Sequence, residues 1–310
     1  METAPFRFDL AAAPDGAKVV WRTTDDGIRL RLAAWTTDTS RGTIVIFPGR
    51  TEYIEKYVRV ITEFIDARWS VAIIDWRGQG FSDRLYSDNR LGHVREFMDY
   101  QRDVAALSAW IDHIELPKPR VLLAHSMGGC IGLRSLVRGL DVSRAVFSAP
   151  MWGIQMPAFA RPLTYFVPPL ARIFRQETLF APGTSPTNYV CEADFDTNML
   201  TSDQETYLWL AEHARSVPEF ALGGPSVQWV GSALQELRRL FSTKKPSVRC
   251  LTFIGSSEQI VSVEAIEDYH RTWEHGELHH VDGAKHEMMM ETPHIRGRFM
   301  RESLEFFNMA

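Results

Sequence analysis

Three residues with the chemistry of a nucleophilic catalyst follow one another along the chain in the order Ser126, Glu258 and His286. A serine hydroxyl attacks poorly until a histidine accepts its proton and a third group orients that histidine. A carboxylate can serve as this third group, because it holds the imidazole in one tautomer and stabilises its charged form. The three residue types therefore predict acyl transfer, with Ser126 as nucleophile, His286 as base and Glu258 as acid.

The residues around Ser126 predict a sharp turn between a strand and a helix. Residues 121–124 are apolar and predict a short buried strand, residues 125–127 turn sharply, and residues 128–131 begin a helix. Ala124 and Gly128 stand two positions before and after the serine, and both are small enough for the strand and the helix to pass closely. Alanine in place of the usual first glycine is a mild departure. The five-residue pattern is common by chance, so its weight depends on the rest of the chain.

Glu258 and His286 each come shortly after a stretch that predicts a strand, as Ser126 does. These two strands are expected at residues 250–254 and 277–281. The carboxyl ends of parallel strands meet at one edge of a sheet, where active sites of open α/β sheets collect. We therefore expect the three side chains to lie close together at that edge.

Two further carboxylates, Asp282 and Asp268, remain candidates for the acid. Asp282 is closer to the candidate base in sequence, but it follows the same strand as that base. Glu258 follows a different strand and is favoured for that reason. Two other histidines are interpreted as structural, because His280 lies inside a predicted strand and His125 packs against the turn.

Attack on an acyl carbon places negative charge on an oxygen atom, which two preorganised backbone N–H groups should meet. Met127 is expected to supply one of them, because it directly follows the nucleophile at the start of a helix. Arg50, in the loop after the predicted strand at residues 43–47, is expected to supply the other. Gly49 would let this backbone approach closely.

Stretches that predict strands and helices alternate through most of the chain. Beyond those already named, strands are expected at residues 19–23, 28–34, 71–75 and 144–148, and helices at 54–65, 97–114, 227–241 and 295–307. The first two strands flank a glycine-containing turn and predict a hairpin. The alternation predicts an α/β fold with a mostly parallel central sheet flanked by helices.

The alternation stops between residues 151 and 224, which are rich in proline, methionine and aromatic residues. Ser202 with Glu205 fits a capping box for one helix there. We interpret this stretch as an inserted helical cap, so the chain divides into core residues 1–150, cap residues 151–224 and core residues 225–310. The apolar cap residues expected to line a substrate pocket are Trp152, Met156 and Phe159.

Composition narrows the classes of protein. Of the 310 residues, 45 % are hydrophobic and 24 % charged, which is typical of a globular protein. The net charge of −5 gives no support for binding nucleic acid. The three cysteines lie far apart without a metal-ligand spacing, which predicts neither disulfides nor a metal site. Residues that predict a signal peptide or a membrane span are not seen, so a cytoplasmic protein is expected. Peripheral contact with a membrane stays open, and the oligomeric state is not indicated.

Five motifs together resemble the monoglyceride lipase and bacterial lysophospholipase branch of the α/β-hydrolase superfamily. They are residues 47–52 (FPGRTE), 74–82 (IDWRGQGFS), 91–94 (LGHV), 125–129 (HSMGG) and 283–287 (GAKHE). The resemblance implies an α/β-hydrolase fold with a helical cap over an acyl pocket. It also implies a serine esterase of single-acyl glycerolipids, a lipid-like small molecule as substrate, and no cofactor.

Within this branch the resemblance assigns the same roles to Ser126, His286, Arg50 and Met127. The sequence departs from the pattern at Pro48, where monoglyceride lipases carry histidine, and at Ala124. It departs again at Glu258, where most members have aspartate; proline and glutamate at these positions resemble the lysophospholipase side. Two other interpretations stay open: a soluble carboxylesterase or another small-molecule α/β-hydrolase, and a non-catalytic protein that binds a ligand.

Charged residues outside the candidate triad are expected either to support the fold or to contact a lipid. Glu52, Asp75 and Arg77 are expected to form one buried network that braces the loop of Arg50. Arginines of the cap are expected either to attract anionic head groups or lipid surfaces or to be ordinary solvated charges; they are Arg161, Arg172 and Arg175.

Overall fold

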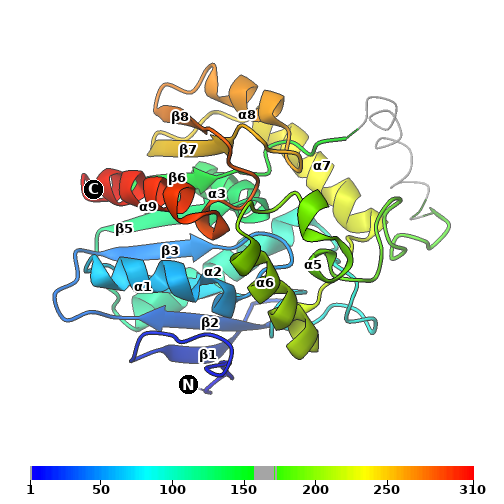
Figure 1. Ribbon diagram of the computed structural model, residues 1–310, viewed down its shortest axis with the longest axis horizontal. Helices are drawn as coiled ribbons and strands as arrows, with labels where there is room; N and C mark the ends of the chain where they lie inside the picture. Colours follow the sequence, from blue (N-terminus) through cyan, green and yellow to red (C-terminus); the bar gives the residue numbers. More distant parts are fainter. Residues whose placement is uncertain (1, 157–170, 172) are drawn as a thin grey trace.

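The computed structural model describes residues 2–156, 171 and 173–310, and its centre is an eight-stranded sheet (Figure 1). The strands lie side by side in the order β1-β2-β4-β3-β5-β6-β7-β8. Their bounds are β1 (Lys18–Thr23), β2 (Arg29–Trp35), β3 (Thr43–Phe47), β4 (Ser70–Ile74), β5 (Arg120–His125), β6 (Arg144–Ser148), β7 (Arg249–Gly255) and β8 (Gly276–Val281).

The sheet is mostly parallel, as the alternation of strands and helices predicted. From β4 to β8 every pair of neighbouring strands is parallel. The predicted hairpin is confirmed, since β1 pairs antiparallel with β2, and β2 also pairs antiparallel with β4. The turn between β1 and β2 contains Gly27, whose φ of 87° suits a residue without a Cβ.

Helices cover both faces of the sheet because successive strand residues point to opposite sides. In β5, Val121 and Leu123 join the core beneath α1 (Val58–Asp66) and α9 (Pro293–Phe307). Leu122 and Ala124 join the opposite core. That second core includes residues of α2 (Tyr100–His113), α3 (Met127–Val137), α7 (Val227–Phe241) and α8 (Val263–His270). A strand buried on both faces reads as a continuous apolar run, which is why β5 was predictable.

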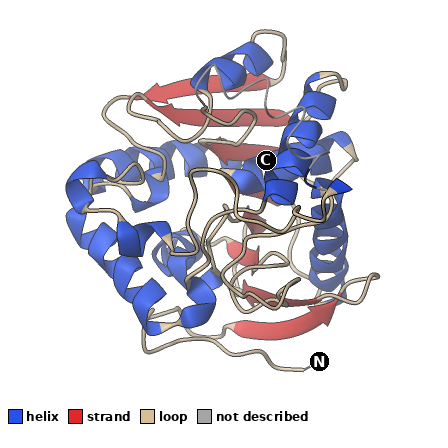
Figure 2. Ribbon diagram, turned by 90° about the vertical axis from the view of Figure 1, so that its right-hand side faces the viewer, coloured by secondary structure: helices blue, strands red, loops and turns tan. Residues whose placement is uncertain are grey.

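The predicted cap stretch contains α5 (Tyr189–Glu192) and α6 (Gln204–Ser216) among its described residues. Both lie near the ends of the strands in Figure 1. Figure 2 looks onto this side and shows loops crowded between the flanking helices. Short helical turns η1 (Ile54–Tyr57), η2 (Phe97–Asp99), η4 (Phe195–Thr197), η5 (Pro218–Phe220) and η6 (Met288–Met290) complete the described elements. The division at residues 150/151 and 224/225 stays a prediction.

The predicted N-cap residue of α6 was wrong by one position. The N-cap of α6 is Asp203, whose carboxylate accepts a hydrogen bond from the backbone N–H of Thr206 at 2.7 Å. Ser202 had been expected there. Serine and aspartate are both good N-caps, so the sequence alone did not distinguish the two neighbours.

Among residues 2–156, 171 and 173–310, no helix combines the length and the apolar character that crossing a membrane requires.

Candidate active site

Ser126 occupies a strained turn between β5 and α3. Its φ of 49° and ψ of −117° lie outside the regions that side-chain-bearing residues usually adopt. A Cβ added to Gly128 would come within 2.1 Å of the carbonyl oxygen of Phe47 and 2.5 Å of that of Pro48. The small residue is therefore required for α3 to pass the β3 loop, as the sequence predicted. Backbone strain of this kind is typical of functional sites.

Ser126, His286 and Glu258 form one chain of hydrogen-bond contacts. The Oγ atom of Ser126 lies 2.9 Å from Nε2 of His286, and Nδ1 of His286 lies 2.7 Å from Oε2 of Glu258. The three residues follow β5, β8 and β7, so the parallel strands bring them to one edge of the sheet. A base within hydrogen-bond reach of a nucleophile, itself held by a carboxylate, is the geometry of nucleophilic catalysis.

The carboxylate of Glu258 is held in place on its far side as well. Its Oε1 atom accepts hydrogen bonds from the backbone N–H groups of Ile260, at 2.6 Å, and Val261, at 3.1 Å. Burial alone would raise the pKa of Glu258, but His286 and these N–H groups lower it below its usual value. Glu258 is therefore positioned as an anion facing the imidazole.

The two other candidate acids lie elsewhere. The Asp282 carboxylate accepts a hydrogen bond from Oγ of Ser256 at 3.2 Å, in an exposed position. Asp268 pairs with Arg271 on α8 at 2.8 Å. The structure therefore brings Glu258 to the imidazole of His286 and does not bring Asp282 or Asp268 there.

The two expected oxyanion donors, the backbone N–H groups of Arg50 and Met127, have no hydrogen-bond partner among the described residues. Gln79 supports the loop of Arg50, because its Nε2 atom donates to the carbonyl oxygens of Gly49, at 2.8 Å, and Glu52, at 3.0 Å. Met127 lies at the N-terminus of α3, where helix N–H groups have no partner inside the helix.

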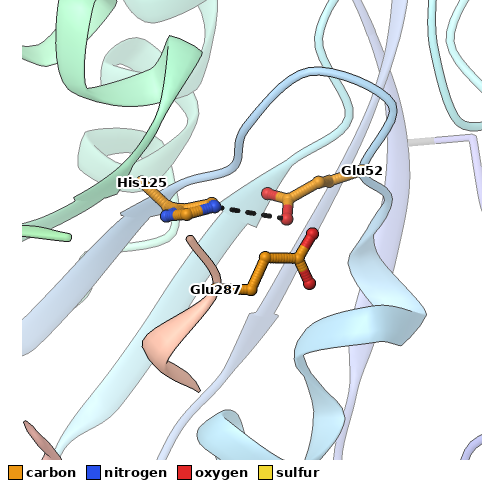
Figure 3. A group of neighbouring side chains, drawn as sticks. All are labelled: Glu52, His125 and Glu287. Atoms are coloured by element: carbon orange, nitrogen blue, oxygen red, sulfur yellow. Dashed lines mark ion pairs between the residues drawn. The ribbon is translucent and has the colours of Figure 1, made fainter. Parts of the chain in front are cut away.

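A buried charged cluster lies directly behind this loop. Glu52, His125 and Glu287 converge there (Figure 3), and their ligand-type atoms lie within 4.8 Å of one another. Three such groups could hold a metal ion. However, the ammonium of Lys56 lies 2.7 Å from both Glu52 Oε1 and Glu287 Oε1, so the cluster already contains its own cation.

Glu52 links this cluster to the loop and to the turn at Ser126. Its Oε2 atom accepts hydrogen bonds from the backbone N–H of Gly49 and from the hydroxyl of Tyr57. Its Oε1 atom lies 3.8 Å from Nε2 of His125, the residue before the candidate nucleophile. Lys56 was not singled out from the sequence. The sequence carries no distinct signal for it, because Glu55, Arg59 and Glu63 are charged in the same helical stretch.

The single network expected from Glu52, Asp75 and Arg77 is absent from the described structure, so that prediction was wrong. Asp75 pairs with buried Arg31 at 2.7 Å, and Arg77 pairs with Asp103 at 2.7 Å. The three residues belong to separate clusters because their partners come from different strands and helices. Nearness in the sequence did not indicate which cation each carboxylate would meet.

Ser126 lines a cavity of about 670 Å³. Its lining is mostly apolar and includes Met151, Met156, Val190, Leu200 and Trp229. Of the predicted pocket residues, Met156 lines this cavity. Phe159 lies outside the described residues, as do Arg161 and Arg172. Arg175 is described and exposed.

Trp152 is not among the residues that line the Ser126 cavity, so its predicted placement was wrong. Its side chain is 1 % exposed and packs in the core against Phe147, Tyr269 and Trp273. Its indole N–H donates to the carbonyl oxygen of Gly129 at 3.2 Å. The aromatic side chain therefore supports the start of the cap stretch, a role that an apolar pattern does not distinguish from pocket lining.

The fold and this site together define an α/β-hydrolase with a serine at the strand–helix turn. Residues 38–293 match the model of the family described as Serine aminopeptidase, S33, and the chain belongs to that family. The predicted resemblance is confirmed, since the relatives fall in its lysophospholipase and monoacylglycerol lipase branch. Family and relatives place the chain among carboxylic-ester hydrolases.

Named relatives support this assignment along most of the chain. Lysophospholipase L2 of Escherichia coli (strain K12) is 30 % identical over an alignment 310 residues long. The alignment covers 93 % of this chain and 88 % of that protein. Monoacylglycerol lipase of Mycolicibacterium smegmatis is 35 % identical over 108 residues, 34 % of this chain and 36 % of that one. The crystal structure of a soluble variant of monoglyceride lipase from Saccharomyces cerevisiae has a TM-score of 0.74 and 19 % identity, with 98 % of each chain covered. This last likeness shows the shared fold.

Proposed function

We propose that this protein hydrolyses the carboxylic ester of a single-acyl glycerolipid through an acyl-enzyme, as a lysophospholipase or a monoacylglycerol lipase does. The observation that carries the proposal is the continuous contact of Ser126, His286 and Glu258 at the wall of an apolar cavity. The names of the relatives, lysophospholipase and monoacylglycerol lipase, support the same substrate class.

In the proposed reaction, Ser126 attacks the ester carbonyl while His286 accepts its proton. Glu258 orients the imidazole and stabilises its charged form. The backbone N–H groups of Arg50 and Met127 bind the negatively charged oxygen of the tetrahedral intermediate. The leaving alcohol takes the proton from His286, and water then attacks the acyl-enzyme by the same route in reverse to release the fatty acid.

The cavity supports an acyl chain as the bound group. Its lining is predominantly apolar, and burial of each methylene is worth about 0.8 kcal/mol. A small-molecule carboxylesterase is the alternative, which would use the same triad without needing the apolar depth.

We also propose that the protein works in the cytoplasm and touches the inner face of the membrane only peripherally. Large apolar side chains are exposed at Ile173, Phe174 and Leu179, 73 %, 67 % and 54 % respectively. These residues come shortly before Ala181 and Pro182, which line the cavity. Sedimentation with lipid vesicles tests the contact: Phe174→Ser should weaken binding, and unchanged binding would count against it.

The test of the activity is release of free fatty acid from a monoacylglycerol and a lysophospholipid that carry the same acyl chain. Wild-type protein should release fatty acid from at least one of them, and Ser126→Ala should release none. A fluorophosphonate probe should label the wild type at Ser126. Labelling without release from either lipid would keep the nucleophile and reject the glycerolipid. Equal release by Ser126→Ala would reject the mechanism.

A further inference from the structure

The cavity beside Ser126 contains a cation with which neither carboxylate of the lining forms an ion pair. The acidic, basic and histidine side chains of the lining are Arg50, Glu52, Lys56, His125, His286 and Glu287. Lys56 forms an ion pair with both Glu52 and Glu287, as described above. His286 faces Glu258, and Arg50 is outside both groups.

Arg50 has no carboxylate partner. No described Asp or Glu oxygen lies within ion-pair distance of its guanidinium. Residues 1, 157–170 and 172, which the structure does not describe, include no Asp or Glu. Its recorded hydrogen bond runs from Nη1 to the carbonyl oxygen of Gly223 at 2.9 Å. A guanidinium has five N–H donors, so most of its donor capacity is open to a ligand.

The guanidinium is held in position by its surroundings. A Cβ on Gly92 would come within 2.7 Å of Nη1, so the glycine makes room for the side chain. The backbone N–H of Gly92 donates to the carbonyl oxygen of Gly224 at 3.0 Å. This bond holds the Gly92 segment next to Gly223, whose carbonyl oxygen accepts from Arg50. The ring of Trp229 lies 5.8 Å from the Arg50 Cζ atom. Burial lowers the pKa of Arg50 to about 10, so the side chain is still cationic at neutral pH.

A half-buried cation without an anion is costly to fold, and an anionic ligand would reduce that cost on binding. Arginine binds phosphate oxygens with two parallel hydrogen bonds, which makes phosphate its preferred partner among ligand anions. The backbone N–H of the same residue is the proposed oxyanion donor. Its side chain therefore starts beside the proposed position of the reacting carbonyl, and its guanidinium reaches the carbonyl oxygen of Gly223.

We propose that the Arg50 guanidinium binds the phosphate of a glycerophospho head group and makes the enzyme prefer lysophospholipids over monoacylglycerols. This inference rests on the proposed function and specifies its substrate. The acyl chain then occupies the apolar part of the cavity lined by residues such as Met156 and Val190, with the phosphate at the Arg50 guanidinium.

The test compares kcat/KM for a lysophospholipid and a monoacylglycerol with the same acyl chain in the same detergent. The wild type should prefer the lysophospholipid, and Arg50→Gln should reduce the ratio of the two kcat/KM values about tenfold to a hundredfold. The ratio cancels any effect on the chemistry that both substrates share. Arg50→Lys, which keeps the charge but loses the planar fork, should retain part of the preference.

Arg84 provides the matched control. Its guanidinium also donates to backbone carbonyl oxygens, of Gly80 at 2.9 Å and Glu219 at 2.6 Å, but it does not line the cavity. Arg84→Gln removes the same charge and should leave the substrate ratio at its wild-type value. An equal change in both variants would overturn the assignment of the phosphate to Arg50.

The remaining outcomes separate this inference from the function on which it rests. Ser126-dependent release with an unchanged ratio in Arg50→Gln overturns the inference and leaves the proposed function standing. No release from either lipid by the wild type overturns the proposed function itself. Inorganic phosphate is added to the monoacylglycerol assay to distinguish a lipid head group from a free anion. Arg50-dependent inhibition without any lysophospholipid preference overturns the head-group assignment.

Discussion

The Oε2 atom of Glu258 lies 2.7 Å from Nδ1 of His286, although 28 residues separate them in the chain. The contact joins the loops that follow β7 and β8, two parallel neighbours in the sheet. The extra methylene of glutamate, compared with aspartate, is accommodated because the backbone N–H groups of Ile260 and Val261 hold the other oxygen. This geometry makes Glu258 the acid to test first.

Glu258→Gln should lower kcat by about a factor of 10²–10⁴, because the amide does not stabilise a charged imidazole and favours the wrong tautomer. Steady-state hydrolysis of a soluble acyl ester measures the effect. Asp282→Asn is the control, since Asp282 is exposed and bonded to Ser256. Loss of activity in Asp282→Asn with a normal rate in Glu258→Gln would assign the acid to Asp282 instead.

Lys56→Met should destabilise the protein by about 3–5 kcal/mol, because it leaves the carboxylates of Glu52 and Glu287 buried without their cation. The side chains of Lys56 and Glu52 are 6 % and 3 % exposed. Urea denaturation measures the free energy of unfolding. Lys118→Met is the control: its pair with Asp141 is 65 % and 73 % exposed, so less than about 1 kcal/mol is expected. Equal effects of the two substitutions would contradict the electrostatic account.

Stability should fall as the pH is lowered from about 6.5 toward 4, partly because of His270. Burial lowers the pKa of His270 from 6.5 to about 4 in the folded protein. Between these values the unfolded chain binds a proton that the folded chain does not, so acid favours unfolding. The contribution is complete above pH 6.5, and its slope is at most about 1.4 kcal/mol per pH unit.

His270→Phe tests this pH dependence while keeping a ring against Trp152 and Trp273. The free energy of unfolding, measured at several pH values, should depend less on pH in this variant than in the wild type. His294→Asn changes an exposed histidine on α9 and should retain the wild-type slope. An unchanged slope in His270→Phe would show that other groups cause the acid sensitivity.

Gly128→Ala should destabilise the protein by about 1–3 kcal/mol or more and reduce probe labelling of Ser126. The added Cβ would meet the carbonyl oxygens of Phe47 and Pro48, which are backbone atoms that do not move aside cheaply. Gly297→Ala is the opposite case. Gly297 is an exposed position of α9 and no atom of another segment lies within 4 Å of its Cβ position, so about 0.5–1 kcal/mol of stabilisation is expected. Thermal unfolding of both variants separates crowding from helix propensity.

Most of the fold could be predicted because its elements carry local signals. The strands at residues 43–47 and 144–148 have the predicted bounds, and α7 does as well. Apolar runs and helical periodicity depend only on neighbouring residues, so they can be recognised before folding is known. The turn at Ser126 was predictable for the same reason, since its small neighbours lie within two positions.

The wrong predictions concern contacts between segments that are distant in the sequence, where several residues of the same type could be the partner. The sequence placed Asp75, Arg77 and Glu52 in one network, whereas each pairs with a cation or acid from another element. An apolar pattern likewise did not separate Trp152, in the core, from Met156, in the cavity. Burial against other segments depends on the packing of the whole chain.

The sequence by itself determined the order of elements, the turn that presents Ser126, and a short list of bases and acids. The sequence favoured Glu258 over Asp282, but the tertiary structure set the contact of Glu258 with His286, and it alone left the Arg50 guanidinium without a carboxylate partner. Both outcomes depend on contacts of a few ångströms between side chains far apart in sequence. Local propensity carries no information about such distances, because the sheet register and loop packing set them only when the chain is folded.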